Sequence, residues 1–352
     1  MHQRIRYLTM PDGIHLAWAE AGCGPMLAKP ANWLTHLEYD WQSPVWRHWM
    51  RFFARHFRFI RYDERGSGMT DWHVGDMLSP ACWLADLTAV IEEARAREPV
   101  ILLGISQGAA TAIDYAASHP ERVSRLILYG GYARGWARRD SPDTERFYHA
   151  MLELMRHGWN SDNPAFRQVF TSRFIPGASD EQLGWFNDLC RRTTTAEIAV
   201  KLLEARGGLD VTALLPKIRA PTLVLHARDD EVVPAVEGRL IASEIPDATF
   251  VELESRNHIL LEHEPAWQAF QERVLEFTGL KHAHAAAFAD LSRREHEVLT
   301  GITDGLTNVQ IADRLNISEK TVRNHISHLF SKLGVRSRAQ AIVLVRDQGL
   351  DV

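Results

Sequence analysis

The sequence predicts a mostly parallel α/β sheet with a helical cap, followed by a small all-α domain of four helices. Up to residue 278, apolar strand-like runs alternate with amphipathic helical runs, which is typical of a sheet covered by helices on both faces. The region 132–215 interrupts this alternation and contains no convincing strand. From residue 290 onward, two sequences typical of helix starts follow each other closely. A chain of 352 residues is long enough for both domains.

Eight strands and five flanking helices are expected in the first domain. The strands are predicted at 5–9, 14–20, 25–30, 57–62, 99–104, 124–129, 222–226 and 248–253. The helices are predicted at 43–55, 82–96, 107–118, 234–244 and 264–277. Region 132–215 follows the sixth strand, so its helices would form a cap over the carboxyl edge of the sheet. Residues 279–289 are expected to be a linker, which leaves domains at 1–278 and 290–352.

Composition indicates a soluble globular protein, with 45% hydrophobic and 24% charged residues. No apolar run approaches the roughly 20 residues that cross a bilayer, and the polar N-terminus predicts no signal peptide. Three scattered cysteines without a CxxC pair indicate a reducing compartment. His282 and His284 lack further ligands for a metal, and Gly66 and Gly68 lack the third glycine of a dinucleotide site. We expect a cytoplasmic protein without membrane, metal or cofactor.

The net charge of −5 conceals a basic segment near the C-terminus. Residues 314–338 contain six lysines and arginines and a single acidic residue, a net charge of +5, so the remainder carries −10. Screening in salt makes distant charge matter little, so a local basic patch can still attract phosphate. The overall acidity therefore does not exclude a nucleic-acid partner.

A candidate nucleophile stands at a sharp turn between a strand and a helix. The segment Gly104-Ile105-Ser106-Gln107-Gly108 joins the buried run 99–104 to the helix predicted at 107–118. Small residues flank Ser106 because such a turn is strained and its neighbours must pack closely. The pattern Gly-x-Ser-x-Gly often occurs by chance. The position of Ser106 between a strand and a helix is therefore what favours a nucleophile.

An acid and a histidine follow this serine in the order that a catalytic triad needs. Asp230 comes after the strand at 222–226, and His258 comes after the strand at 248–253. His258 would take the proton of the Ser106 hydroxyl, while Asp230 would orient the imidazole and stabilise its cation.

Together these motifs make residues 1–280 resemble an α/β hydrolase throughout. The segment Tyr62-Asp63-Glu64-Arg65-Gly66-Ser67-Gly68 is similar to the family's loop after its fourth strand. Ala227 occupies the place of the family's usual glycine, and counting from it favours Asp230 over Asp229 as the acid. The resemblance implies a serine hydrolase fold with its site at the carboxyl edge of the sheet.

The loop after the third strand departs from the family pattern. The family has a His-Gly pair there, whereas this chain has Lys29-Pro30-Ala31-Asn32-Trp33, with Asn32 in place of the glycine. By resemblance, the backbone amides of Trp33 and Gln107 would form the oxyanion hole. Losing one such donor typically costs about 10²–10³ in rate. Hydrolysis and binding without turnover therefore both stay open.

Aromatic residues are frequent in the region 132–215 and on the loop after the third strand. We expect several of them to line an apolar ligand pocket above Ser106. The candidates are Trp33, His36, Trp41, Tyr132, Trp136, Tyr148 and Met151. Most aromatic residues at helical spacing belong to a core, so only a few should touch a ligand.

The C-terminal region has the pattern of a DNA-binding helix. Capping boxes at 292–295 and 307–310 predict two helix starts, and a third helix starts after Ser318. The third helix has one apolar stripe and, opposite to it, a polar and basic stripe. The polar stripe consists of Lys320, Arg323, Asn324, Ser327 and Ser331. Such a face suits the floor of a major groove, although a merely solvated face is the simpler alternative.

Residues 287–352 closely resemble the LuxR-type helix-turn-helix. The matching residues are Leu291-Ser292, Arg294-Glu295, Glu297-Val298-Leu299, Gly305, Thr307-Asn308, Ile311-Ala312, Leu315, Ile317-Ser318, Thr321-Val322, His325-Ile326, Lys332-Leu333, Arg338-Ala339 and Ala341. The resemblance implies that Arg323, Asn324 and Ser327 face bases. It also implies that phosphates are held by Lys320, Thr321 and Lys332. Ile342 and Val345, exposed on a last helix at 338–348, would make a dimer contact.

The sequence thus predicts a ligand-responsive transcription regulator that binds promoter DNA as a homodimer. Its hydrolase-like domain would bind a small apolar or acyl-ester molecule, with or without hydrolysing it. The leading alternative is a serine esterase with an appended regulatory DNA-binding domain. A third hypothesis is that the hydrolase-like domain is a rigid scaffold that needs no ligand. Turnover of an acyl ester would distinguish the esterase from the regulator. A change in unfolding temperature on adding ligand would distinguish the ligand-responsive regulator from the rigid scaffold.

Overall fold

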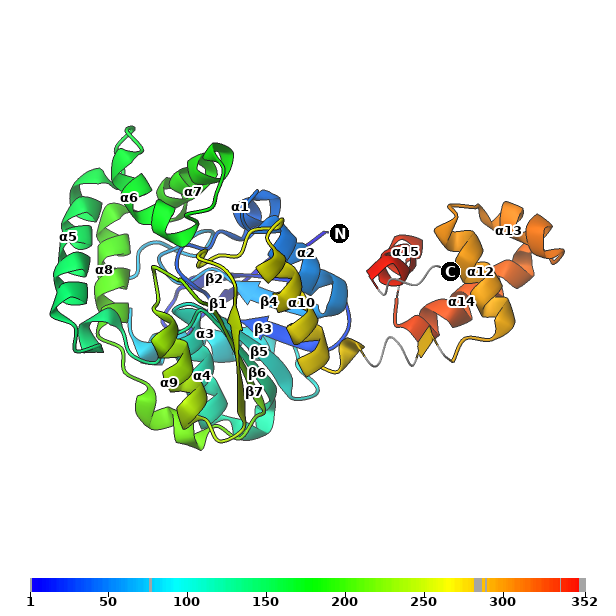
Figure 1. Ribbon diagram of the computed structural model, residues 1–352, viewed down its shortest axis with the longest axis horizontal. Coiled ribbons are helices and arrows are strands. Elements are labelled where there is room, and N and C mark those ends of the chain that lie inside the picture. Colours follow the sequence, from blue (N-terminus) through cyan, green and yellow to red (C-terminus); the bar gives the residue numbers. More distant parts are fainter. Residues whose placement is uncertain (1, 76–77, 282–286, 289, 336, 348–352) are drawn as a thin grey trace. The chain divides into compact units, whose positions relative to one another are not determined.

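The computed structural model describes residues 2–75, 78–281, 287–288, 290–335 and 337–347 (Figure 1). It divides the chain into two compact units, Met1–Val274 and Leu275–Val352. His282, His284 and most of the predicted linker lie outside the described residues. Within the described part, no helix is long and apolar enough to cross a membrane. Among the described side chains, no group of three or more histidines, cysteines and carboxylates is arranged so that it could hold a metal ion.

The first unit is built on one eight-stranded sheet in the order β1-β2-β4-β3-β5-β6-β7-β8. The strands are β1 (Arg4–Thr9), β2 (His15–Ala21), β3 (Met26–Lys29), β4 (Arg58–Tyr62), β5 (Val100–Ile105), β6 (Val123–Tyr129), β7 (Thr222–Ala227) and β8 (Ala248–Leu253). β2 pairs antiparallel with β1 and β4, and all other pairs are parallel. The predicted mostly parallel sheet is confirmed.

Helices cover both faces of this sheet (Figure 1). One face carries α2 (Arg47–His56) and α10 (Pro265–Phe277), and the other carries α3 (Pro80–Glu93), α4 (Gly108–Ser118) and α9 (Ala235–Glu244). The rings of Trp49 and Phe270 lie 4.7 Å apart between α2 and α10. Every residue of β5 is buried, as expected for a central parallel strand with helices on both sides. A short helix missed in the sequence, α1 (Leu37–Gln42), precedes α2.

The predicted cap is a helical insertion between β6 and β7. It contains α5 (Pro142–Gly158), α6 (Ala165–Phe174), α7 (Asp180–Thr193) and α8 (Ala196–Gly207), which Figure 1 shows grouped on one side of the unit. The chain enters and leaves the cap through one narrow neck. There the N–H of Val211 donates to the carbonyl of Ala133 at 2.9 Å, and the N–H of Gly135 donates to the carbonyl of Leu209 at 2.8 Å.

A buried ion pair fastens the cap to the sheet. Arg206 of α8 pairs with Glu64 of the loop after β4, and both side chains are at most 3% exposed. The Arg206 guanidinium also lies 3.4 Å from the ring centroid of Trp83 and donates to the hydroxyl of Thr111 at 3.3 Å. Burial raises the pKa of Glu64, although the charge of Arg206 opposes that effect. Arg206 therefore links α8 to the loop after β4, to α3 and to α4, the helix that follows Ser106.

The second unit contains four helices, α12 (Arg293–Thr303), α13 (Asn308–Leu315), α14 (Glu319–Leu333) and α15 (Arg338–Asp347). Both predicted capping boxes form, at Ser292 with Glu295 and at Thr307 with Gln310. Asn316 adopts a left-handed conformation with φ 52° in the turn between α13 and α14. This is the helix-turn-helix that the sequence predicts.

The apolar side of α15 closes the core of this second unit. Val345 is only 4% exposed and belongs to that core, and Ile342 packs against it. The prediction that both residues are exposed for a dimer contact is therefore wrong. The helix turns this apolar side inward because α15 packs on α12 and completes a core that three helices alone would leave open.

Candidate active site and candidate DNA-binding face

Ser106 sits on the strained turn that the sequence predicts. It joins β5 to α4 with φ 52°, a left-handed conformation that residues other than glycine seldom adopt. The N–H of Ser106 donates to the carbonyl of Tyr129 at 2.9 Å, and its own carbonyl accepts from Ala109 at 3.0 Å. These bonds hold the turn so that the side chain stands at the carboxyl edge of the sheet, where it borders a cavity.

The two glycines around Ser106 are required by close packing. A Cβ on Gly104 would lie 2.6 Å from the Cα of Ala109, and one on Gly108 would lie 2.9 Å from the carbonyl oxygen of Ala31. Backbone atoms cannot retreat easily from such contacts. The second contact also presses the loop after β3 against the start of α4, which places Trp33 and Gln107 on the same cavity as Ser106.

His258 and Asp230 form a buried, hydrogen-bonded pair. Nδ1 of His258 lies 2.6 Å from Oδ2 of Asp230, and Oδ1 of Asp230 accepts from the backbone N–H groups of Val232 and Val233 at 2.8 and 2.9 Å. Burial raises the pKa of Asp230, but the charge and the hydrogen bond of His258 outweigh burial and lower it overall. A carboxylate can only accept, so Nδ1 carries the proton of this bond, and Nε2 has a lone pair whenever the ring is neutral. Asp229, the second choice for the acid, is exposed instead.

The structure brings this pair to the same turn as Ser106. A Cβ on Gly130 would lie 3.0 Å from Cε1 of His258, and one on the adjacent Gly131 would lie 3.6 Å from the carbonyl oxygen of Ser106. Phe174 lines the cavity with Ser106, and its ring lies 5.3 Å from that of His258. Nε2 of His258 is buried and has no hydrogen-bond partner among the described residues. It is therefore available as a base.

A second histidine lies next to the acid but plays a packing role. Nε2 of His226 is 2.8 Å from the carbonyl of Val233 and 3.7 Å from Oδ2 of Asp230. Burial lowers the pKa of His226, so the ring is neutral at physiological pH and its Nε2–H donates to the carbonyl. A neutral His226 does not compete with His258 for the carboxylate.

The loop after β3 is held by its unusual residues. The Lys29 ammonium is buried and donates to the side-chain oxygen of Asn32, whose amide donates to the carbonyl of Trp33 at 3.2 Å. Burial lowers the pKa of Lys29. The backbone amides of Trp33 and Gln107 donate no hydrogen bond within the described part of the chain. Asn32 thus replaces the family's glycine without consuming either amide expected in the oxyanion hole.

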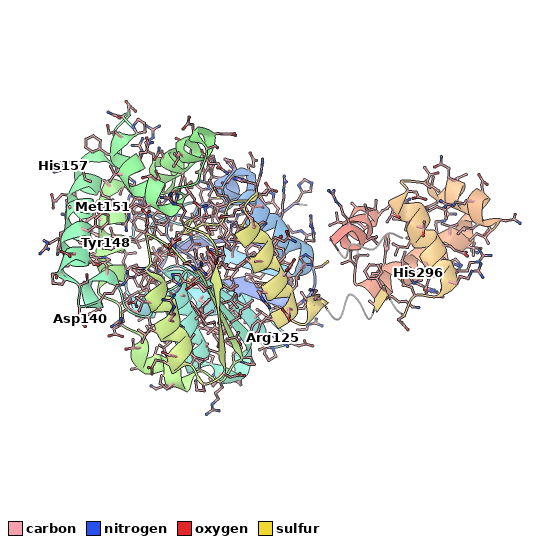
Figure 2. The ribbon with its side chains drawn as sticks, in the orientation of Figure 1. Arg125, Asp140, Tyr148, Met151, His157 and His296 are labelled. Atoms are coloured by element: carbon pink, nitrogen blue, oxygen red, sulfur yellow. The ribbon has the colours of Figure 1, made fainter. Side chains whose placement is uncertain are left out.

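A partly enclosed cavity lies above Ser106, and its empty space is about 550 Å³ when the part open to solvent is included. Most of its lining is apolar and comes from the cap. The lining residues are Trp33, Ser106, Gln107, Tyr132, Trp136, Arg139, Phe147, Tyr148, Met151, Phe170, Arg173, Phe174, Leu203, Val232 and Val233. Figure 2 shows Tyr148 and Met151 on α5, where a spacing of three residues puts both on one helix face.

Two residues expected at this cavity are not among its lining residues. His36 instead caps α1, where its Nδ1 accepts from the N–H of Tyr39 at 3.2 Å. Trp41 lies within α1. Arg139 and Arg173, which do line the cavity, were not predicted, because nothing in the sequence separates them from surface arginines.

The polar stripe predicted on the third helix is exposed on α14. Lys320, Arg323, Asn324 and Ser327 all face solvent, and Arg323 makes only an exposed ion pair with Glu319 at 2.9 Å. Thr321 is half-buried. Its N–H donates to the Ser318 hydroxyl at 3.1 Å, so it helps to cap the helix.

Lys332, expected to hold a phosphate, has an internal partner. Its ammonium lies 2.9 Å from Oε2 of Glu295, the capping-box carboxylate of α12, and donates to the carbonyl of Asp290 at 3.0 Å. The hydrogen bonds from Lys332 and from the Ser292 backbone lower the pKa of Glu295 to about 2. Since the Glu295 side chain is only 6% exposed, Lys332 neutralises a covered charge, and a DNA phosphate would compete with Glu295 for the same ammonium.

Comparison with known proteins gives a separate match for each unit. Residues 47–266 match the serine aminopeptidase S33 family, and residues 289–345 match the bacterial regulatory proteins of the luxR family. The chain is 28% identical over 213 residues to pyrrolizixenacetamide deacetylase from Xenorhabdus hominickii, covering 59% of this chain and 76% of that protein. It is 43% identical over 84 residues to the nitrate/nitrite response regulator protein NarP from Escherichia coli, covering 23% of this chain and 39% of that protein.

Solved structures match the first unit. A hydrolase from Pseudomonas aeruginosa PA01 superimposes with a TM-score of 0.64 at 26% identity, covering 78% of this chain and 98% of that one. An esterase from Exiguobacterium antarcticum superimposes with a TM-score of 0.65 at 23% identity, covering 77% of this chain and 98% of that one, which shows a shared fold.

Proposed function

Because the chain belongs to the serine aminopeptidase S33 family of α/β hydrolases and ends in a luxR-family DNA-binding domain, we propose that it is a ligand-responsive transcription regulator. The hydrolase-fold unit binds a small molecule, and α14 reads promoter DNA. One observation carries this proposal. The same chain holds a largely apolar cavity at Ser106 and, in its other unit, an exposed polar and basic helix face. The domains are proposed at 1–278 and 290–352, joined by a linker at 279–289.

The DNA-binding part of the proposal assigns roles to the exposed residues of α14. Arg323, Asn324 and Ser327 face base edges, and Lys320 and the N-terminal end of the helix at Thr321 face phosphates. One such helix covers a short half-site, so two chains bind a site with twofold symmetry. The dimer contact then lies on a surface other than Ile342 and Val345. DNA is in the cytoplasm of a bacterial cell, and that is where we place the protein.

A second activity, serine hydrolysis, is favoured by the hydrogen bond between His258 and Asp230 and by the two free amides. The Ser106 oxygen attacks the carbonyl carbon of an acyl ester while its proton moves to Nε2 of His258. The oxyanion accepts from Trp33 and Gln107. The ester bond then breaks, and the leaving alcohol takes the proton from Nε2. Water repeats the sequence on the acyl-enzyme, releasing the acid and restoring the serine hydroxyl.

Two measurements test the proposal on the full chain. Salt-dependent binding to a promoter fragment, followed by fluorescence anisotropy, is expected and should be lost on deleting residues 290–352. Labelling by a fluorophosphonate probe is expected in the wild type and absent in Ser106→Ala. If the protein binds DNA and is not labelled, the proposed regulator is supported and serine hydrolysis is excluded. A chain that is labelled and shows no salt-dependent DNA binding favours the esterase alternative.

A further inference from the structure

The charge of the cavity lining is one-sided. Arg139 and Arg173 both line it, and no aspartate or glutamate does so among the described residues. Neither arginine lies within ion-pair distance of a carboxylate in the part of the chain that the structure describes. The cavity therefore presents two positive charges and no negative charge to whatever enters it.

Neighbouring cap arginines differ in this respect. Arg146 pairs with Asp143, Arg156 with Glu204 at 2.7 Å, Arg191 with Asp162 at 3.0 Å, Arg192 with Asp188 at 2.5 Å, and Arg134 with Glu237 at 2.8 Å. Carboxylates are thus plentiful on this surface. Arg139 and Arg173 nevertheless have no carboxylate within ion-pair distance in the described part of the chain.

Each of the two guanidinium groups is held in place without being neutralised. Arg139 donates to the carbonyl of Arg134 at 3.0 Å and lies 5.0 Å from the ring centroid of Tyr132. Arg173, on α6, donates to the carbonyl of Glu231 and lies 4.1 Å from the ring centroid of Phe147. A guanidinium has five N–H donors, so one carbonyl bond leaves most of them free. A fixed and unneutralised guanidinium is suited to bind an oxyanion.

Neutral donors in the same cavity point to the same ligand chemistry. Trp33 and Gln107 line the cavity, and the indole Nε1–H of Trp33 and the amide Nε2 of Gln107 are buried without a partner among the described residues. A buried donor without an acceptor costs free energy, which a ligand oxygen would recover. Apart from Ser106 and the thioether of Met151, the remaining lining is aromatic or aliphatic, so the body of the ligand is apolar.

From these observations we infer that the ligand is an amphipathic organic anion. Its apolar body lies against the cap, and its oxyanion, a carboxylate or a phosphate, is bound by Arg139 and Arg173. This inference rests on the proposed ligand-binding function and specifies the class of molecule for that site. It also predicts selectivity, because a neutral isostere would leave both arginines without a counter-charge in a partly enclosed space.

The test uses three probes with one body: 6-phenylhexanoate, 6-phenylhexyl phosphate and neutral 6-phenylhexanamide, each titrated calorimetrically into the full chain. The preferred anion should bind at least about tenfold more tightly than the amide, which is the effect of one charge-assisted hydrogen bond. Its affinity should fall as salt rises, while that of the amide should not. Comparison of the carboxylate with the phosphate identifies which oxyanion the site prefers.

Variants then assign the effect to the two arginines. Arg139→Met with Arg173→Met should weaken the anion by about tenfold or more and leave the amide within about twofold, and each single variant should show part of this loss. Arg138→Met is the matched control, because Arg138 is exposed, donates to the carbonyl of Gly208 at 3.3 Å and does not line the cavity. Equal binding of amide and anions, with no effect of salt, overturns the anion inference and keeps ligand binding. No binding of any probe counts against the proposed ligand-binding function itself.

Discussion

Replacing Arg206 by Met should destabilise the first unit strongly. The substitution keeps most of the side-chain volume but leaves the Glu64 carboxylate, at 3% exposure, without its partner. Removing one member of a buried ion pair typically costs about 3–5 kcal/mol, because the remaining charge stays buried and uncompensated. In a domain of this size each kcal/mol lowers Tm by about 2–4 °C. We expect a decrease in Tm of about 6–20 °C.

The distribution of tryptophan makes this measurement selective. All 11 tryptophans of the chain lie in the first unit, so intrinsic fluorescence follows its unfolding alone, whereas far-ultraviolet circular dichroism follows both units. The loss in Arg206→Met should be smaller at pH 5 than at pH 8. Burial already raises the pKa of Glu64, and removal of Arg206 raises it further, so acid protonates the stranded carboxyl and relieves the cost.

A double variant provides the control. Adding Glu64→Gln to Arg206→Met removes the stranded charge and should recover a large part of the lost stability. The reasoning is refuted if Arg206→Met unfolds within about 2 °C of the wild type, or if the double variant is no more stable than the single one at pH 8.

Further outcomes are expected for substitutions of Lys332, Arg323 and Asp230. Lys332→Met should lower the unfolding temperature of the second unit, measured by circular dichroism, without moving the fluorescence transition. At low temperature this variant should bind DNA with nearly unchanged affinity. Lys320→Met should instead weaken DNA binding and leave the unfolding temperature of the second unit nearly unchanged. The stability difference caused by Lys332→Met should shrink as pH falls from about 4.5, the ordinary range of a glutamate pKa, towards 2, where Glu295 becomes protonated in the folded protein as well. Arg323→Ala should cost about 1–3 kcal/mol of DNA binding and relax sequence preference, measured by anisotropy on a set of single-base variants. Asp230→Asn should sharply slow fluorophosphonate labelling of Ser106, whereas Asp229→Asn should not; equal rates in the two variants would contradict the assignment of the acid.

Much of the fold was predictable because its signals are local. β5 is a continuous apolar run since both its faces are buried, and α12 and α13 begin at capping boxes that four residues define. The turn at Ser106 was readable because Gly104 and Gly108 are sterically required. These features depend on a residue and its near neighbours in sequence, so a single chain reveals them.

The missed features depend on contacts between distant residues. The helix α1 has only six residues, too few for a periodic pattern, and so His36 could not be recognised as its cap. Lys332 has the sequence context of a phosphate ligand, and only the fold brings it 2.9 Å from a carboxylate 37 positions away. Ile342 and Val345 are two apolar residues at a helical spacing, and this pattern fits a buried and an exposed helix face equally well. The sequence therefore did not show that Val345 is buried.

The neck of the cap has a consequence for how this protein family diversifies. Because Val211 and Gly135 bond across the neck to Ala133 and Leu209, the insertion starts and finishes at neighbouring points on the sheet. A segment with adjoining ends can be replaced as one block, while the strands on either side keep their register. Most of the cavity wall would change with that block, and Ser106, Asp230 and His258 would stay where they are. Evolution, or a protein engineer, can therefore exchange most of the cavity lining by recombination and keep the sheet and the turn at Ser106 unchanged.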